Sequence, residues 1–179
     1  MGSDFINFDT ALNTGMRLLK SPKRQEQIVG LYIITAIYTG MRTGDIQKLT
    51  FEQLRQDAIT INEEKTNKRR TITIHPAIHE ALKKIGGTGF VFMSQKNQVY
   101  TTQALNRLLK DHFKQLAKKN NISTHSLRKT FGRRVYDNAG QSEHALVALS
   151  ELFAHSNIQV TRIYLGLKQE ELRDIYLSL

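Results

Sequence analysis

Two arginines, two histidines and one tyrosine stand in three short segments of this chain and could together act on a phosphate group. Arg42 lies in the segment Thr39-Gly-Met-Arg-Thr-Gly-Asp45. The second segment is His125-Ser-Leu-Arg128, and the third runs from His155 to Tyr164, nine residues later. An arginine stays positively charged and can bind two phosphate oxygens at once through its planar guanidinium. The set therefore predicts chemistry at a phosphodiester, which composition alone does not indicate.

Arg42 and Arg128 are the candidates for a clamp on the non-bridging phosphate oxygens. In-line attack on a phosphodiester concentrates negative charge on these oxygens in the transition state. Loss of one donor that stabilises such developing charge typically lowers the rate by about 10²–10³-fold. His125 lies three residues before Arg128, so both side chains project to one side if the segment is a helix.

Tyr164 is the candidate nucleophile. A phosphotyrosyl ester retains the energy of the broken phosphodiester, so the reaction can be reversed. The reference pKa of a phenol is about 10, which means that Tyr164 needs a base or a strong local positive charge. The leaving 5′ oxygen needs a proton, and a lysine on a charged loop can supply it. Lys65 lies in such a polar segment, Glu63 to Arg70.

The charge of the chain favours a polyanionic partner. Its 26 Lys and Arg against 16 Asp and Glu give a net charge of +10. Such an excess attracts an anion over about 8–10 Å at ordinary salt, although a basic ribosomal or merely soluble protein has the same composition. Cysteine is absent, which excludes disulfides, thiolate zinc sites and a cysteine nucleophile. No signal peptide and no apolar run of about 20 residues is present, so we expect a cytoplasmic, nucleoid-associated protein without membrane partners.

Hydrophobic periodicity predicts an α+β fold that is mainly α, with one small antiparallel sheet. A β-hairpin is expected from strands 58–61 and 71–74, with its charged tip at 63–70, and residues 90–92 form a further candidate strand. The predicted helices begin at residue 8, at an N-cap Ser21 followed by Pro22, at Pro76 and at a cap Thr102. Gly40 and Gly86 are expected to end the second and third of these. Further helices are expected over 126–138, 143–153, around Tyr164 and over 168–179.

The three segments resemble the catalytic domain of the tyrosine recombinases, the phage-integrase family. Thr39 to Ile46 is similar to the block around the family's first arginine, and Thr124 to Phe131 to its His-x-x-Arg box. Leu152 to Tyr164 is similar to the family's stretch from a histidine to the nucleophile. Each motif alone is weak, but the three occur in the family's order. The resemblance covers roughly residues 5–179.

The resemblance implies a function and a role for each site residue. Tyr164 would attack the scissile phosphate, form a 3′-phosphotyrosyl bond and release a 5′ hydroxyl, and a partner strand would then reverse the step. His155 would contact the phosphate together with the two arginines, and His125 would assist proton transfer at the phenol. The family places its catalytic lysine on a β-hairpin, a position that Lys65 fits and for which Lys68 is the rival. Neither a metal nor another cofactor is required.

The resemblance also sets expectations for the rest of the chain. We expect residues 1–179 to form a single catalytic domain without the family's N-terminal core-binding domain, Met1 to Ser3 being typical of residues left by cloning. Asp45 stands where the family commonly has an acidic residue and would brace Arg42 or the helix that carries Arg128. Ala154 replaces a glycine that usually precedes the family's histidine. Double-stranded DNA is the expected partner, with a synaptic tetramer formed by the full-length protein, and the C-terminal tail packs either on its own domain or on a neighbouring copy.

Three alternative functions remain at the level of the sequence. A type IB topoisomerase uses similar chemistry but rotates a strand, and a basic accessory module would bind DNA without cutting it. A metal-dependent nuclease is the third, but the carboxylates show no spacing typical of a two-metal site. These carboxylates are Asp45, Glu52, Asp57, Glu63 and Glu64.

Overall fold

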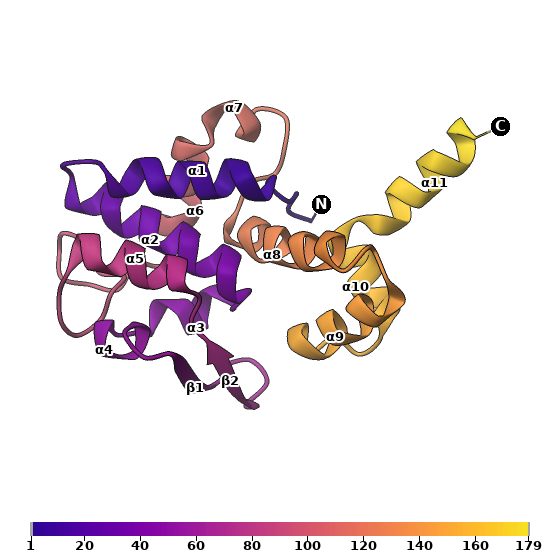
Figure 1. The fold of residues 1–179 in the computed structure, drawn as a ribbon. Coiled ribbons are helices and arrows are strands. Elements are labelled where there is room, and N and C mark those ends of the chain that lie inside the picture. The colour runs from indigo at the N-terminus through magenta and orange to yellow at the C-terminus, as the bar shows by residue number, and fades with distance from the viewer. Residues whose placement is uncertain (1, 179) are drawn as a thin grey trace. The chain divides into compact units, whose positions relative to one another are not determined.

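The computed structural model describes residues 2–178, apart from the side chains of residues 168–172, and its elements are shown in Figure 1. It is mainly helical with a two-stranded antiparallel sheet, so the predicted fold class is confirmed. The chain divides into two compact units, residues 1–131 and 132–179, and the division falls inside helix α8 (Thr124–Asn138). None of the described helices is long and apolar enough to cross a membrane.

The first unit contains most of the helices and both strands. Its helices before α8 are α1 (Phe8–Leu19), α2 (Arg24–Thr39), α3 (Thr43–Gln47), α4 (Phe51–Leu54), α5 (Pro76–Ile85), α6 (Thr102–His112) and α7 (Lys114–Ala117). The strands are β1 (Ala58–Asn62) and β2 (Arg69–Thr73). The expected helices at residues 8–19 and 76–85 are confirmed with the same bounds.

Helix α2 is the centre of this unit's core, because nearly all of its side chains from Ile28 onward are buried. It packs against α1 on one side and α5 on another. Gly30 lets α1 approach closely, since a Cβ there would lie 2.7 Å from the carbonyl oxygen of Gly15. Gly40 then ends α2 in a left-handed conformation, with φ 59°, as predicted.

The β-hairpin forms in the predicted place, with Ile59 opposite Ile72 in an antiparallel register. These two side chains are buried, while Ala58, Thr60, Thr71 and Thr73 on either side of them are exposed. The alternation follows the two-residue period of a strand and fixes one face of the hairpin against the core.

Three local expectations were wrong. Helix α2 begins at Arg24, because Ser21 belongs to the turn that ends α1: its N–H bonds to the Leu18 carbonyl. Helix α6 is capped by the hydroxyl of Thr101, which accepts from the N–H of Ala104, so Thr102 is the first helical residue. Residues 90–92 are not a strand, since Phe90 forms only an isolated bridge to Thr50.

The second unit follows Phe131 and contains α9 (Glu143–Phe153), α10 (Ile158–Leu165) and α11 (Leu167–Leu177), in addition to the end of α8. Gly132 of α8 allows close packing, since a Cβ there would lie 2.7 Å from Leu165 and 3.0 Å from the ring of Phe153. The helices expected over 143–153 and around Tyr164 are confirmed.

The C-terminal tail is helical as predicted, and its described apolar side chains are exposed. Ile175 is 58% exposed and Tyr176 is 76% exposed, so neither packs within its own unit. Leu172 and Leu179, the other apolar positions of the predicted face, lie outside the described side chains.

Ala154 ends α9 in a left-handed conformation, with φ 53° and ψ 45°. Its N–H bonds to the Glu151 carbonyl, and the next N–H, of His155, bonds to the Ser150 carbonyl. The replacement of the family's glycine therefore matters through the backbone, because a residue with a Cβ is strained in this region by about 1–2 kcal/mol.

We predict that Ala154→Gly raises the free energy of unfolding by about 0.5–1 kcal/mol, since glycine relieves this strain at some entropic cost. Denaturant unfolding would measure the change. Ala148→Gly is the matched control, because Ala148 is an exposed residue inside α9 and its replacement should lower stability by about 1 kcal/mol. A destabilised Ala154→Gly variant would contradict the prediction.

Candidate active site

The carboxyl end of α2 binds two arginines from segments that are distant in the sequence. The carbonyl of Thr39 accepts from Nη2 of Arg70 at 3.4 Å, and the carbonyl of Gly40 accepts from Nη1 of Arg128. The last carbonyls of a helix lack partners within it and attract cations. Arg128 is only 5% exposed, so this contact fixes a buried guanidinium beside the backbone that leads to Arg42.

Gly40 is needed here for a second reason besides its positive φ. A Cβ at this position would overlap the ring of Phe131, which lies one turn beyond Arg128 in α8. The glycine therefore allows α8 to pack on the end of α2. This contact brings the Thr39-to-Asp45 segment and the His-x-x-Arg box together, as the predicted clamp requires.

Arg42 is held by a buried carboxylate that follows strand β1. Its Nη1 lies 2.6 Å from Oε2 of Glu63, and Nη1 of Arg70 lies 3.4 Å from the other carboxylate oxygen. Glu63 is 3% exposed. Burial alone raises the pKa of Glu63. Hydrogen bonds from Thr66 and Arg42, together with the positive charges of Arg42 and Arg70, lower this pKa by more than burial raises it. The pKa therefore lies below its ordinary value, and Glu63 is ionised at neutral pH.

The hairpin tip places Lys65 and Lys68 on the surface, and both side chains are exposed. The hydroxyl of Thr66 donates to Oε2 of Glu63 at 2.7 Å, and the N–H of Asn67 donates to the Glu63 carbonyl at 2.8 Å. The tip is therefore a closed turn that begins at the carboxylate bound to Arg42.

His125 lies in the first turn of α8, three residues before Arg128, as expected. Desolvation lowers the pKa of His125, and the positive charges of Arg128, Lys129 and Lys65 lower it further. A histidine with a lowered pKa is neutral at pH 7 and can accept a proton.

His155 and Tyr164 lie together in the second unit. Nδ1 of His155 is 2.9 Å from the hydroxyl of Thr161 in α10, and this contact orients the imidazole. The ring of Tyr164 meets that of His155 edge-on, with centroids 5.2 Å apart, and it also contacts Phe153 at 5.4 Å. The predicted pair is thus adjacent, because α10 returns Tyr164 to the residues at the end of α9.

The six predicted site residues fall into two groups. Arg42, Lys65, His125 and Arg128 belong to the first unit. His155 and Tyr164 belong to the second. Asp45 does not have the role expected for it toward Arg42: its Oδ1 accepts from the backbone N–H of Glu64 at 2.9 Å, and Glu63 is the carboxylate that binds Arg42.

Sequence reasoning missed Glu63, Arg70 and Thr161 as partners of the site. A signal existed for Glu63, which lies two and four residues after the inward-facing positions Ile61 and Ile59. The strand period therefore places it on the buried face, although its charged neighbours suggested a solvated tip. No comparable signal identifies Thr161, although it lies only three residues before Tyr164.

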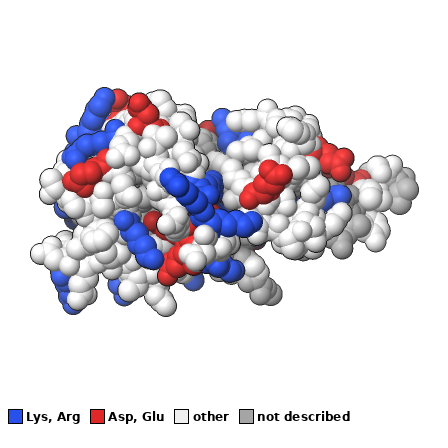
Figure 2. Space-filling view, turned by 90° about the horizontal axis from the view of Figure 1, so that it is seen from below, with Lys and Arg blue, Asp and Glu red and all other residues white. Residues whose placement is uncertain are grey.

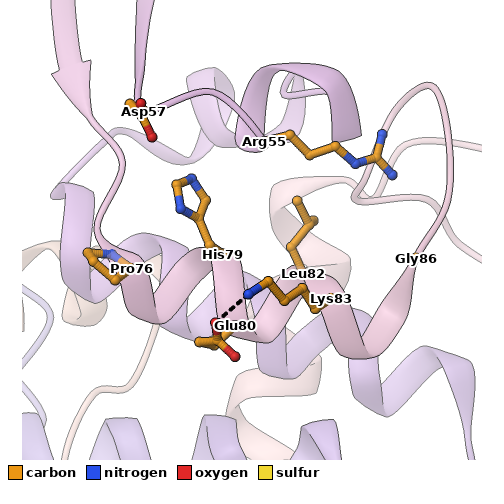
Figure 3. Close-up of a pocket in the computed structure, with 8 residues that line it drawn as sticks. All are labelled: Arg55, Asp57, Pro76, His79, Glu80, Leu82, Lys83 and Gly86. Atoms are coloured by element: carbon orange, nitrogen blue, oxygen red, sulfur yellow. Dashed lines mark hydrogen bonds and ion pairs between the residues drawn. The ribbon is translucent and has the colours of Figure 1, made fainter.

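A separate pocket of about 480 Å³ lies elsewhere in the first unit, between the end of α4 and helix α5 (Figure 3). Its polar lining includes Arg55, Asp57, His79 and the Lys83–Glu80 ion pair, whose atoms are 2.7 Å apart. None of the six predicted site residues lines it. We therefore do not assign the phosphate chemistry to this pocket.

Comparison with known proteins identifies the family. The model of the phage integrase family matches residues 16–171. The chain belongs to the phage integrase family. Tyrosine recombinase XerC of Bacillus pumilus is 26% identical over 163 residues, which cover 82% of this chain and 52% of that protein. XerC of Bacillus subtilis is also 26% identical, over 78% of this chain and 49% of its own length. The chain thus spans about half the length of these relatives.

Solved structures of family members share the fold. XerH site-specific recombinase, bound to palindromic difH substrate in a post-cleavage complex, matches with a TM-score of 0.70 and 20% identity. That match covers 96% of this chain and 52% of XerH. XerA recombinase matches with a TM-score of 0.67 and 19% identity, over 98% of this chain and 63% of XerA. The expected fold of the family's catalytic domain is therefore confirmed.

We predict that His125 titrates below its ordinary value of about 6.5, because desolvation and three positive charges disfavour its protonated form. An NMR titration of the imidazole would give the midpoint. Lys65→Gln should raise it by removing one of those charges, and Lys68→Gln is the matched control that should leave it nearly unchanged. A midpoint at or above 6.5 in the wild type would contradict the prediction that the pKa of His125 is lowered.

Proposed function

We propose that this chain is the catalytic domain of a site-specific DNA recombinase that cuts and rejoins DNA through Tyr164. The observation that carries the proposal is the bond from Arg128 to the Gly40 carbonyl, two residues before Arg42, in a family member that also has Tyr164 beside His155. A protein that only binds DNA has no need of a phenol and two phosphate-binding arginines. Family membership supports the same reaction.

In the proposed reaction, the phenol oxygen of Tyr164 bonds to the scissile phosphorus, and the bond to the 5′ oxygen breaks. Arg42, Arg128 and His155 bind the non-bridging oxygens, where they stabilise charge that develops in the transition state. The phosphate is left as a 3′-phosphotyrosyl ester. Reversal by a 5′ hydroxyl of a second duplex exchanges the strands, and residues 1–179 act as one catalytic domain in both steps.

Two proton transfers accompany these bond changes. His125, neutral at pH 7 because its pKa is lowered, accepts the phenol proton directly or through water. Lys65 on the exposed hairpin tip donates a proton to the leaving 5′ oxygen. Because the ester conserves the bond energy, the reaction consumes no nucleotide. The arginines supply the positive charge that metal-dependent nucleases obtain from metal ions.

Double-stranded DNA is the proposed partner. The net charge of +10 favours it, and Lys65, Lys68 and Arg69 at the hairpin tip are exposed and basic. Figure 2 shows that Lys and Arg side chains are mixed with Asp and Glu on the face drawn there, so the affinity depends on particular basic side chains rather than on uniform charge. The protein would act on chromosomal or mobile-element DNA in the cytoplasm.

We further propose that the full-length protein self-associates on DNA as a synaptic tetramer. The support is helix α11, on which Ile175, Tyr176 and Leu177 expose 58%, 76% and 72% of their surface. Three neighbouring apolar side chains at this exposure favour burial against a second copy over solvent. The tail would then pack on a neighbouring protomer.

The test is covalent capture on nicked suicide substrates, from which a short fragment dissociates after cleavage and prevents religation. In EDTA, the wild-type chain should give a protein–DNA band on a denaturing gel, and Tyr164→Phe should give none while it still binds DNA. Tyr136→Phe is the matched control and should retain the band. A band from Tyr164→Phe, or a band that EDTA abolishes, would overturn the tyrosine mechanism.

The outcome also separates the alternatives. A type IB topoisomerase would form the same band but would relax supercoils without exchanging strands between two duplexes. A non-cutting accessory protein would bind DNA and give no band, even when joined to the rest of the full-length recombinase.

A further inference from the structure

We propose that Glu63 is a positioning residue for DNA cleavage, which holds both Arg42 and the hairpin tip that carries Lys65. This inference rests on the proposed function and assigns to a buried carboxylate the positioning of two groups that act on different oxygens of the scissile phosphate. Arg42 would bind its non-bridging oxygens, and Lys65 would protonate the leaving oxygen.

The first part of the argument is the contact with Arg42. Oε2 of Glu63 lies 2.6 Å from Nη1 of Arg42, a distance typical of a strong, charge-assisted hydrogen bond. A guanidinium is planar, so a carboxylate that fixes one of its nitrogens also fixes the plane in which its other N–H groups lie. Glu63 is 3% exposed, and the contact is therefore weakly screened by salt.

The second part is the hairpin tip. The side chain of Glu63 accepts from the Thr66 hydroxyl, its carbonyl accepts from the N–H of Asn67, and its own N–H donates to the Lys68 carbonyl at 3.0 Å. Lys65 lies inside the turn that these bonds close. Glu63 thus fixes the backbone on both sides of the exposed lysine as well as the arginine.

The third part is the balance of charge. Arg70 lies 3.4 Å from Oε1 of Glu63, and it also bonds to the end of α2. The carboxylate therefore pairs with two partly buried guanidiniums that would otherwise repel each other. Because two cations share it, the single negative charge of Glu63 is divided between Arg42 and Arg70 rather than neutralising Arg42 alone.

The neighbouring acidic residue provides a matched comparison. Glu64 pairs with Lys48 at 3.2 Å, and its side chain is 61% exposed. The bonds to Arg42 and Thr66 described above are made by Glu63 and not by Glu64. An exposed ion pair of this kind contributes little. Glu64→Gln removes the same charge from the adjacent position and should cleave within about twofold of the wild type.

The test is single-turnover cleavage of nicked suicide substrates by Glu63→Gln, which keeps the shape of the side chain but removes its charge. We expect a rate about 10²-fold lower, the order of loss that a displacement of about 1 Å causes at a reacting group. DNA affinity should change by only a few fold. A wild-type cleavage rate for Glu63→Gln would overturn the proposal.

Two substrate analogues distinguish positioning from general loss of structure. A sulfur in place of the leaving 5′ oxygen makes protonation by Lys65 unnecessary, since the reference pKa of a thiol is only about 8.5. A methylphosphonate at the scissile position removes one anionic oxygen and so weakens the need for Arg42. On each analogue, we expect the ratio of the wild-type cleavage rate to the Glu63→Gln rate to fall at least tenfold. The rate of Lys65→Gln should recover only with sulfur, and that of Arg42→Ala only with the methylphosphonate.

An equal defect of Glu63→Gln on all three substrates would show a structural role alone and overturn the proposal. If Glu63→Gln does not fold by circular dichroism, Thr66→Val replaces it, because this variant loses the bond to the hairpin and keeps the pair with Arg42. Its defect should recover with sulfur only, and wild-type cleavage by Thr66→Val would overturn the proposal. Failure of the wild-type protein to cleave any substrate, in the full-length recombinase as well as in this chain, would instead refute the proposed function.

Discussion

The carboxyl end of helix α2 organises the part of the site that lies in the first unit. The left-handed turn at Gly40 ends the helix and leaves its last carbonyls without partners inside it. Guanidiniums of Arg70 and Arg128 bind two of these carbonyls. Because the same turn leads directly to Arg42, the contacts that complete the helix end also bring Arg128 beside the backbone that precedes Arg42, as the proposed clamp requires. Stability of the fold and assembly of the clamp thus depend on the same few hydrogen bonds.

A clamp for phosphate must keep its positive charges in place when no phosphate is bound, and buried like charges are costly unless they are paired. Glu63 pairs with two of these charges, since its two carboxylate oxygens contact Arg42 and Arg70. Asp45 acts on the backbone instead, because it binds the N–H of Glu64 and so ties the start of the hairpin tip to helix α3. Glu63 therefore holds Arg42, and Asp45 holds the backbone at the start of the hairpin tip.

Much of the fold was predictable because long apolar periodicity decides where helices lie. This holds for α1, α5 and α9, whose predicted bounds agree with the structure, and for the hairpin, whose isoleucines alternate with exposed residues. The start of α2 was not predictable, because Ser21 serves the turn after α1 rather than the next helix. The motifs identified the candidate site residues but not what holds them. The partners of Arg42 and His155 are set by tertiary contacts with Glu63 and Thr161, which neither motif spacing nor charge pattern specifies.

The central claim is that Tyr164 becomes bonded to DNA, and mass spectrometry of the trapped complex tests it most directly. Nuclease and trypsin digestion of that complex should leave a 3′-phosphonucleotide on one peptide, residues 163–168, since trypsin cleaves after Arg162 and Lys168. Fragmentation of this peptide is predicted to place the added mass on Tyr164. The nucleotide on a peptide that contains Tyr136 or Tyr176, or on a serine or threonine, would contradict the account.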